Sequence, residues 1–496
     1  MVTTRLVLHS RFAVGEVSPL IFGGFLEHLG RSIYQGVYDP QSSHADADGM
    51  RTDVIEALRE LALTVVRYPG GNFASGYHWR DGIGPRESRP AVRELAWQSL
   101  EPNTFGTDEF IALCRKLDWQ PMIAVNLGTG SPEEARDWVE YCNAPTGTRD
   151  ADLRSANGSP VPHAVPFWCL GNEMDGPWQL GHVPAEQYAI RAQQAAKMMK
   201  DVDRGIATVA CGSSAPGMPT FLEWDRNVLE HLGALADYVS LHRYVGNPND
   251  SPEDYLALSN SIDRQIEAVD ACTRYVQERL RLPKRAYLCF DEWNVWYRAR
   301  GGVHSDGRGR FAPHLIEERY NLEDALVVAI FLMSFIRHAD SVKIANLAQL
   351  VNVIGPLLTR RDDLLKQSIF YAFRMVSARK AGVSLRGAVD GSGYTSERYG
   401  AVNYLDHAAV LDGDRLHVFA VNRHVEDAMQ LTVECADREI AGVADSEILH
   451  ADLKAENTFD EPEVVTAREF GGWVTNGNAV ADLPPHAFVA TTFRMA

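Results

Sequence analysis

Two glutamates follow apolar segments that are typical of buried strands. Residues 167–170 lead into Asn172 and Glu173, and residues 287–290 lead into Glu292 with aromatic neighbours. Glycoside hydrolysis needs such a pair of carboxyl groups, one to protonate the leaving oxygen and one to attack or to activate water. Each glutamate alone is equally compatible with a structural ion pair, but the two together favour catalysis.

The elements that must position these glutamates alternate between strand-like segments and helical or loop segments. This alternation predicts an α/β protein built on a (β/α)8 TIM barrel with loop insertions. The eight strand-like segments are residues 20–25, 64–68, 122–128, 167–170, 209–212, 238–244, 287–292 and 342–349.

Most of these strands end in a polar or charged residue. Barrel enzymes keep their active sites at the carboxyl-end rim, so we expect these side chains to meet there. The rim residues are Glu27, Arg67, Asn72, Asn126, Asn172, Glu173, His242, Tyr244, Glu292 and Gln349. Trp97, Trp178 and Trp296, with Tyr244, are candidates for stacking on sugar faces, although Trp97 is equally compatible with the core.

Beyond about residue 375 the pattern changes to strands only. Residues 408–411 and 415–421 flank an Asp-Gly turn and predict a hairpin. We therefore expect a jelly-roll-like β-sandwich, completed by the amino-terminal strand and structural in role. The predicted domains are a catalytic barrel, residues 18–374, and a sandwich formed by residues 1–17 and 375–496.

Composition excludes several classes of partner. The net charge of −18 disfavours nucleic acid. The longest apolar run, residues 325–336, is too short for a membrane span and predicts a buried helix.

The first residues lack a secretory signal, so we expect a cytoplasmic protein. The seven cysteines show no C-x-x-C spacing and are expected to be reduced.

Cofactor motifs are absent from the sequence. There is no H-x-H, no H-E-x-x-H and no phosphate-binding glycine loop. Residues 44–49 hint at a calcium loop but lack its third acidic position and its closing glutamate. We expect neither a metal nor another cofactor.

With these residues in place, the sequence resembles the family 51 glycoside hydrolases, the intracellular α-L-arabinofuranosidases. An Asn-Glu pair alone is common to many barrel glycosidases, but the string Gly-Asn-Glu-Met-Asp-Gly-Pro-Trp is specific. The matching stretches are residues 24–30, 67–73, 168–178, 290–296 and 347–352. The resemblance implies an exo-acting, retaining enzyme that releases α-L-arabinofuranosyl groups from oligosaccharides derived from arabinoxylan or arabinan.

The resemblance also implies roles for individual residues. Glu173 would be the acid/base and Glu292 the nucleophile. The sugar would be held by Glu27, Asn72, Asn172, Tyr244 and Gln349. We further expect Arg67 to pair with Glu292, and His242 to pair with a rim carboxylate.

The chain departs from the family pattern after His242. Arg243 and Val245 stand where the family pattern has Gln and a second Tyr, which affects any subsite lined by this loop. The resemblance implies a homo-oligomer, a hexamer.

Three alternatives stay open at this stage. Another retaining barrel glycosidase, such as an endoglucanase or a β-xylosidase, would share both carboxylates. A non-catalytic carbohydrate-binding barrel would not need both of them. A metal-dependent barrel hydrolase would need clustered His and Asp ligands.

Overall fold

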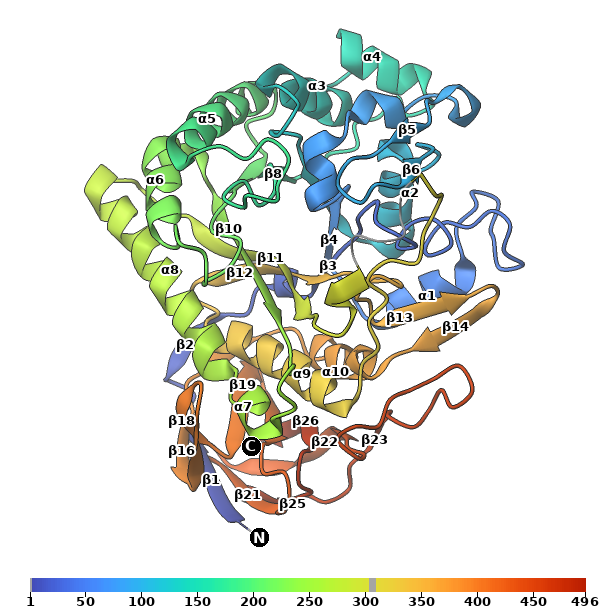
Figure 1. Cartoon of the computed structure of the whole chain (residues 1–496). Coiled ribbons are helices and arrows are strands. Elements are labelled where there is room, and N and C mark those ends of the chain that lie inside the picture. Colours follow the sequence, from blue (N-terminus) through green and yellow to red (C-terminus); the bar gives the residue numbers. More distant parts are fainter. Residues whose placement is uncertain (1, 303–308) are drawn as a thin grey trace.

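A closed barrel of eight parallel strands forms the larger part of the molecule (Figure 1). The computed structural model describes residues 2–302 and 309–496. The strand order around the barrel is β10-β11-β12-β3-β4-β7-β8-β9. Their bounds are β3 (Gly23–Phe25), β4 (Val65–Tyr68), β7 (Gln120–Ala124), β8 (Phe167–Leu170), β9 (Ala207–Ala210), β10 (Tyr238–Val245), β11 (Tyr287–Val295) and β12 (Val342–Ala348).

The predicted barrel is confirmed, and each of its strands overlaps a predicted segment, although β7 and β9 each begin two residues earlier than predicted. The first strand is shorter than expected because Pro19–Ile21 forms a 3-10 turn. Ser18 caps this turn by accepting a hydrogen bond from the Leu20 amide, and proline suits the first position of such a turn.

Helices surround the barrel. They are α1 (Thr52–Glu60), α2 (Thr107–Leu117), α3 (Pro132–Asn143), α4 (Arg149–Ala156), α5 (Ala185–Val202), α6 (Glu223–Leu232), α7 (Pro252–Leu256), α8 (Ser259–Leu280), α9 (Leu322–Arg337) and α10 (Ser368–Ser377). Asn321 caps α9 by accepting a hydrogen bond from the Asp324 amide. Helix α9 is buried on nearly all sides, as the apolar run predicted. Among the described residues, no helix combines the length and apolar character needed to cross a membrane.

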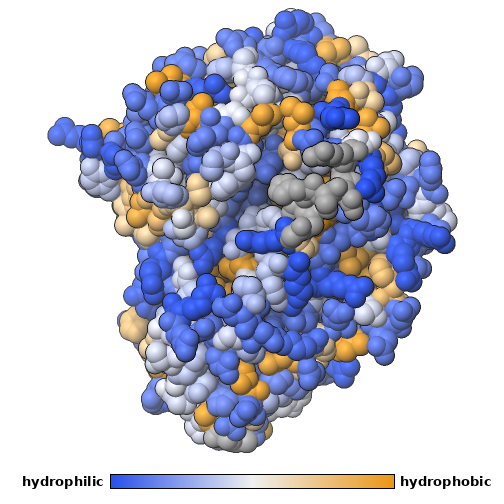
Figure 2. All heavy atoms as spheres, in the orientation of Figure 1, coloured by the Kyte–Doolittle hydropathy of each residue, from blue (hydrophilic) through white to orange (hydrophobic). Residues whose placement is uncertain are grey.

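Side chains fill the barrel interior. Met122, Cys169, Cys289 and Ile344 pack together there, and Trp168 on the outer side of β8 packs against Trp138 of α3. The seven cysteines are free, and all except the half-buried Cys272 of α8 are buried. The face seen in Figure 2 is mainly hydrophilic, with hydrophobic side chains scattered over it.

Two sheets stack into the sandwich below the barrel in Figure 1, where both chain termini lie. The five-stranded sheet has the order β16 (Ala388–Gly391), β1 (Val2–Leu8), β21 (Met429–Cys435), β25 (Asn478–Leu483) and β24 (Val474–Asn476). The seven-stranded sheet has the order β2 (Ala13–Glu16), β15 (Val383–Leu385), β19 (Leu405–Asp412), β20 (Arg415–Asn422), β26 (Phe488–Met495), β22 (Ile440–Leu449) and β23 (Ala467–Glu469).

The amino-terminal segment completes this sandwich, as predicted. Strand β1 runs parallel to β21 and antiparallel to β16, so it lies inside the five-stranded sheet. The predicted hairpin is β19 and β20, with Gly413 in the left-handed conformation at its turn. Short two-stranded pairs complete the chain, namely β5 (Val92–Arg93) with β6 (Leu100–Glu101), β13 (Leu357–Arg360) with β14 (Asp363–Lys366), and β17 (Gly393–Ser396) with β18 (Gly400–Asn403).

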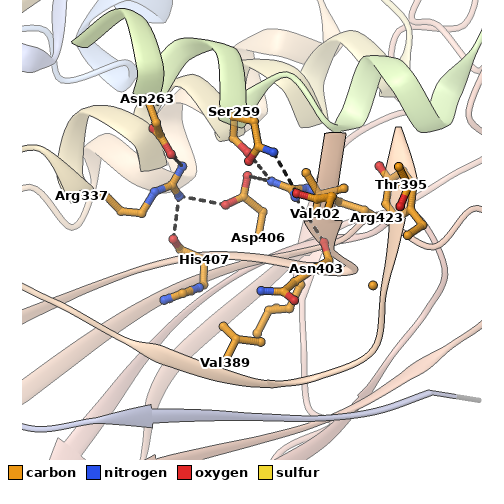
Figure 3. A pocket seen from close by; sticks show the side chains of 15 residues that line it. Ser259, Asp263, Arg337, Val389, Thr395, Val402, Asn403, Asp406, His407 and Arg423 are labelled. Atoms are coloured by element: carbon orange, nitrogen blue, oxygen red, sulfur yellow. Dashed lines mark hydrogen bonds and ion pairs between the residues drawn. The ribbon is translucent and has the colours of Figure 1, made fainter. Parts of the chain in front are cut away.

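A network of buried charges joins the barrel to the sandwich (Figure 3). Asp406 of β19 accepts hydrogen bonds from Arg337 of α9, at 2.8 Å, and from Arg423. Arg337 also pairs with Asp263 of α8, and Arg423 donates to Ser259 at 2.6 Å. Asp406 is 5% exposed, so its charge depends on both guanidinium groups for compensation.

The substitution Asp406→Ala should lower the free energy of unfolding by about 3–5 kcal/mol, because it leaves the buried Arg423 without a counter-ion and the half-buried Arg337 with Asp263 alone. Urea denaturation measures this change. Asp363→Ala is the matched control, since Asp363 forms an exposed pair with Arg360 and its loss should stay within about 1 kcal/mol of wild type. Equal losses in the two variants would contradict the assignment.

Candidate active site

A cavity of about 550 Å³ opens at the carboxyl ends of the barrel strands. Both candidate glutamates line it, together with residues from loops that follow several strands, as expected for a barrel active site. Its lining consists of Glu27, Leu29, Gly71, Asn72, Ala96, Trp97, Glu173, Trp178, Ser214, Ala215, Tyr244, Glu292, Trp296, Arg300, Ile316, Gln349 and Ile354.

Glu292 stands on β11 with a hydrogen-bond donor on each carboxylate oxygen. Arg67 Nη1 donates to Oε1 at 2.6 Å, and the Tyr244 hydroxyl donates to Oε2 at 2.8 Å. Arg67 comes from β4, is fully buried, and also donates to Asn172 Oδ1 at 2.8 Å. The expected contact of Arg67 with Glu292 is therefore present, and it fixes the carboxylate while stabilising its negative charge.

Glu173 follows the end of β8, and its backbone lies in the left-handed region with φ of 45°. Trp178 Nε1 donates to Oε2 at 2.6 Å, and His242 Nδ1 lies 2.9 Å from Oε1. One carboxylate oxygen of Glu173 lies within 4.8 Å of one from Glu292. Retaining glycosidases hold their carboxyl groups about 5–5.5 Å apart, whereas inverting enzymes separate them by about 6.5–9.5 Å, so the short distance fits retention.

His242 on β10 lies between three carboxylates. Its Nδ1 is 2.9 Å from Glu173 and 3.5 Å from Glu292, and its Nε2 is 3.3 Å from Asp291. Burial by itself lowers the pKa of His242, but the charges of Glu292 and Asp291, with hydrogen bonds to Asp291 and Glu173, raise that pKa well above 6.5. A raised pKa favours the protonated form of His242, which donates hydrogen bonds from both nitrogens to the surrounding carboxylates.

Glu27, just beyond β3, forms a second acidic position beside Glu292. It accepts hydrogen bonds from the Phe73 amide at 3.0 Å and from Trp97 Nε1 and Gln349 Nε2 at 3.1 Å each. Burial, and then the negative charge of Glu292, raise the pKa of Glu27 to about 8, although the hydrogen bonds from Phe73 and Trp97 and the charge of Arg67 lower it. At neutral pH the Glu27 carboxyl is therefore largely protonated.

A glycine allows these two acids to approach each other. A Cβ atom on Gly71 would lie 3.1 Å from Glu292 Oε1 and 3.2 Å from either oxygen of Glu27, which is tighter than most contacts. Gly71 also precedes the 3-10 turn Asn72–Gly76, which places Asn72 at the cavity wall. Because Gly71 has no side chain, its loop can approach both carboxyl groups closely.

The structure brings the predicted site residues together in two layers. Nine line the cavity, namely Glu27, Asn72, Trp97, Glu173, Trp178, Tyr244, Glu292, Trp296 and Gln349. Arg67, Asn172 and His242 are buried behind them and contact the glutamates or one another. The rim residue Asn126 has a different place, because its Oδ1 accepts the amides of Gly128, Thr129 and Gly130 and so orders its own loop.

Two family models match the chain. The "Alpha-L-arabinofuranosidase 1 domain" matches residues 57–261, and the "Alpha-L-arabinofuranosidase C-terminal domain" matches residues 291–487. The chain is 42% identical to the intracellular exo-α-(1→5)-L-arabinofuranosidase 1 of Bacillus subtilis over 98% of each protein. It is also similar to a family 51 α-L-arabinofuranosidase structure from Bifidobacterium longum, with a TM-score of 0.95 and 36% identity over the whole of both chains. The chain belongs to the family 51 α-L-arabinofuranosidases.

A third comparison adds an arabinofuranosidase with bound arabinose. The α-L-arabinofuranosidase of Thermotoga maritima in its arabinose complex has a TM-score of 0.89 and 33% identity, over 99% of this chain and 100% of that one. A bifunctional glucanase-xylanase from a metagenome library shares only the fold, at 12% identity and a TM-score of 0.60.

Several residues of this arabinofuranosidase site were not found from the sequence. Asp291 lies 3.3 Å from both Arg67 Nε and His242 Nε2, and its position beside Glu292 was the available signal. Asp175 accepts the Ser214 amide at 2.9 Å, and burial raises the pKa of Asp175 to about 6. The apolar wall residues Leu29, Ile316 and Ile354 come from loops and carry no sequence pattern.

The raised pKa of Glu27 predicts a pH-dependent stability. Between its usual pKa of 4.5 and about 8, the unfolded chain loses this proton while the folded enzyme keeps it, so wild type loses stability as pH rises. Glu27→Gln removes this titration. The melting temperature of the variant minus that of wild type should therefore increase from pH 4.5 to 8 in thermal unfolding scans. A difference that stays constant over this range would contradict the assignment.

Proposed function

We propose that the protein is an intracellular, exo-acting enzyme that releases terminal α-L-arabinofuranosyl groups with retention of configuration. Its substrates are oligosaccharides derived from arabinoxylan or arabinan. The observation that carries the proposal is the separation of at most 4.8 Å between oxygens of Glu173 and Glu292 in one cavity. Relatives from Bacillus subtilis and Acetivibrio thermocellus bear the name intracellular exo-α-(1→5)-L-arabinofuranosidase, which supports it.

The first step forms a covalent intermediate. The Glu292 carboxylate attacks the anomeric carbon, the bond from this carbon to the glycosidic oxygen breaks, and protonated Glu173 gives its proton to the leaving oxygen. Arg67 and Tyr244 orient Glu292 for this attack through their hydrogen bonds.

The second step releases arabinose. Glu173, now a carboxylate, takes a proton from water as the water attacks the anomeric carbon and displaces Glu292. Two displacements at one carbon restore its original configuration. His242 contacts both glutamates, so we assign it the role of a positioning residue that balances their charges.

The cavity walls supply contacts to the sugar. Glu27, Asn72 and Gln349 present polar groups to its hydroxyls from one side of the cavity. Asn172 is buried beneath, held by Arg67 and within 3.3 Å of Asn72, so its amide helps to orient that wall. Trp97, Trp178 and Trp296 supply aromatic surfaces for the sugar or its aglycone.

Hydrolysis of 4-nitrophenyl α-L-arabinofuranoside tests both roles. Wild type should prefer it strongly over the β-D-xylopyranoside and the β-D-glucopyranoside. Glu292→Ala should abolish turnover, because no nucleophile remains. Glu173→Ala should lose about 10²–10⁴-fold in rate and regain part of it with azide, which attacks the intermediate without a general base.

The control variant is Glu461→Ala, which removes an exposed glutamate of the sandwich and should retain wild-type rates. A wild-type preference for either pyranoside would refute the substrate assignment. Full activity in Glu292→Ala would refute the mechanism.

The family resemblance also supports a homo-oligomer, a hexamer. Light scattering coupled to size exclusion should give a mass near six times the chain mass of 55.0 kDa. A monomeric mass at working concentrations would contradict this assembly.

A further inference from the structure

A second cavity, of about 430 Å³, lies beside the active-site cavity. The two cavities share Ala215, Tyr244, Trp296 and Arg300 in their walls. The part of a substrate that extends beyond one furanose would therefore lie close to the second cavity.

The outer wall of this second cavity comes from the sandwich part of the chain. Arg398 and Tyr399 lie in the turn between β17 and β18. The barrel holds this turn in place, because Ser396 donates to Asp254 at 2.6 Å and Asn260 donates to the Tyr399 carbonyl at 3.1 Å. These two hydrogen bonds hold the turn that carries Arg398 and Tyr399 against the barrel.

Three arginines line the second cavity, and none forms an ion pair within the described parts of the chain. Arg243 donates to the Ser261 hydroxyl at 2.6 Å, and its Nε is buried without a hydrogen-bond partner. Arg300 donates to the Trp296 carbonyl at 2.7 Å and lies over that indole ring, 4.8 Å from its centroid. Arg398 lies over the Tyr399 ring at 5.3 Å.

This arrangement is unusual in a chain with a net charge of −18. Arg298, in the same loop as Arg300, pairs with Asp324 at 2.7 Å. The second cavity, by contrast, has no aspartate or glutamate among the described residues that line it. Burial lowers the pKa of Arg243, the neighbouring Tyr399 raises it, and the positive charge of Arg398 lowers it further.

The same walls present aromatic rings. Trp296, Tyr297 and Tyr399 line the second cavity beside the arginines. Aromatic faces bind the apolar faces of sugar rings, and guanidinium groups bind carboxylates through paired hydrogen bonds. A sugar that carries a carboxylate satisfies both kinds of group at once.

The two positions where the chain departs from the family pattern both belong to this cavity. Arg243 contributes one of the charges, and Val245 also lines the wall. Relative to the family pattern, Arg243 therefore adds a positive charge beside the active-site cavity. The part of the substrate beyond the arabinofuranosyl group would lie there.

We propose that this arginine-lined cavity is a subsite for a uronic acid, so that the preferred substrates carry a uronosyl residue near the arabinofuranosyl group. The inference rests on the proposed function, because it places the uronic acid on the leaving side of that reaction.

Two matched substrate pairs test the subsite. One pair is an arabinofuranosyl xylo-oligosaccharide with and without a glucuronosyl substituent, and the other is an arabinofuranosyl galacto-oligosaccharide with and without the same substituent. Wild type should show kcat/KM about tenfold higher for the uronosyl member of at least one pair, the gain expected from one charge-assisted hydrogen bond. Preference in the first or in the second pair assigns the source of the uronate.

Arg398→Gln should remove most of this preference, because it deletes one cation without touching the reacting carbon. Arg386→Gln is the matched control, since Arg386 is also exposed, forms no ion pair within the described chain and lies outside the cavity. Equal kcat/KM within both wild-type pairs, or an unchanged preference in Arg398→Gln, would overturn the subsite.

Hydrolysis of 4-nitrophenyl α-L-arabinofuranoside separates this proposal from the proposed function. Turnover of this glycoside without any uronosyl preference overturns the subsite alone. If wild type does not turn it over, the proposed function fails, and titration calorimetry decides the subsite independently. The subsite is then supported if D-glucuronate or D-galacturonate binds, D-glucose does not, and Arg398→Gln weakens the binding. It is overturned if neither uronate binds.

Discussion

The charge balance between two buried cations and three carboxylates governs the active site. Arg67 and His242 lie among Asp291, Glu292 and Glu173, and all of these side chains except that of Glu173 are almost fully buried. In the state that begins the proposed reaction Glu173 is protonated, so two cations face the two carboxylates of Asp291 and Glu292. Removing any one of these four charges then leaves another without compensation in a medium of low dielectric constant. Because the five groups come from three strands, β4, β10 and β11, and from the end of β8, the closed barrel is what holds them in register.

Such a cluster adds little net stability to the fold, because desolvation of its charges offsets much of their attraction. Apolar packing in the barrel interior, around α9 and between the sandwich sheets offsets the desolvation cost of these charges. The contact between Arg337, Asp406 and Arg423 couples the sandwich to this scaffold. The sandwich also contributes Arg398 and Tyr399 to the rim, so it shapes the substrate path as well as covering the barrel.

The active-site cavity and the second cavity are lined by side chains of opposite charge. The active-site cavity is lined by Glu27, Glu173 and Glu292, whereas the second cavity is lined by arginines and by no described carboxylate. Trp296, Tyr244 and Arg300 belong to both and form the boundary. The arginines of the second cavity complement the negative charge of the proposed uronic acid, whereas the furanose in the active-site cavity is neutral.

The sequence by itself determined the barrel, the sandwich and the two catalytic candidates. Periodic apolar runs that end in polar residues identify strands and their rim, because the pattern is local in the chain. The string around Glu173 added the family, and with it the expected roles. The position of Arg67 at the rim predicted a carboxylate partner, but the choice among Glu27, Glu173 and Glu292 depended on the tertiary structure, which places Arg67 on Glu292.

Only the tertiary structure decided which side chains complete the site. Asn126 shares the polar strand-end pattern of Asn172, yet it binds its own loop, because the direction of a side chain depends on neighbouring strands. The raised pKa of Glu27 arises from burial beside Glu292, which is distant along the chain. The arginine-lined cavity joins residues of β10, the loop after β11 and the turn after β17. No local pattern relates these segments, since closure of the barrel and docking of the sandwich bring them together.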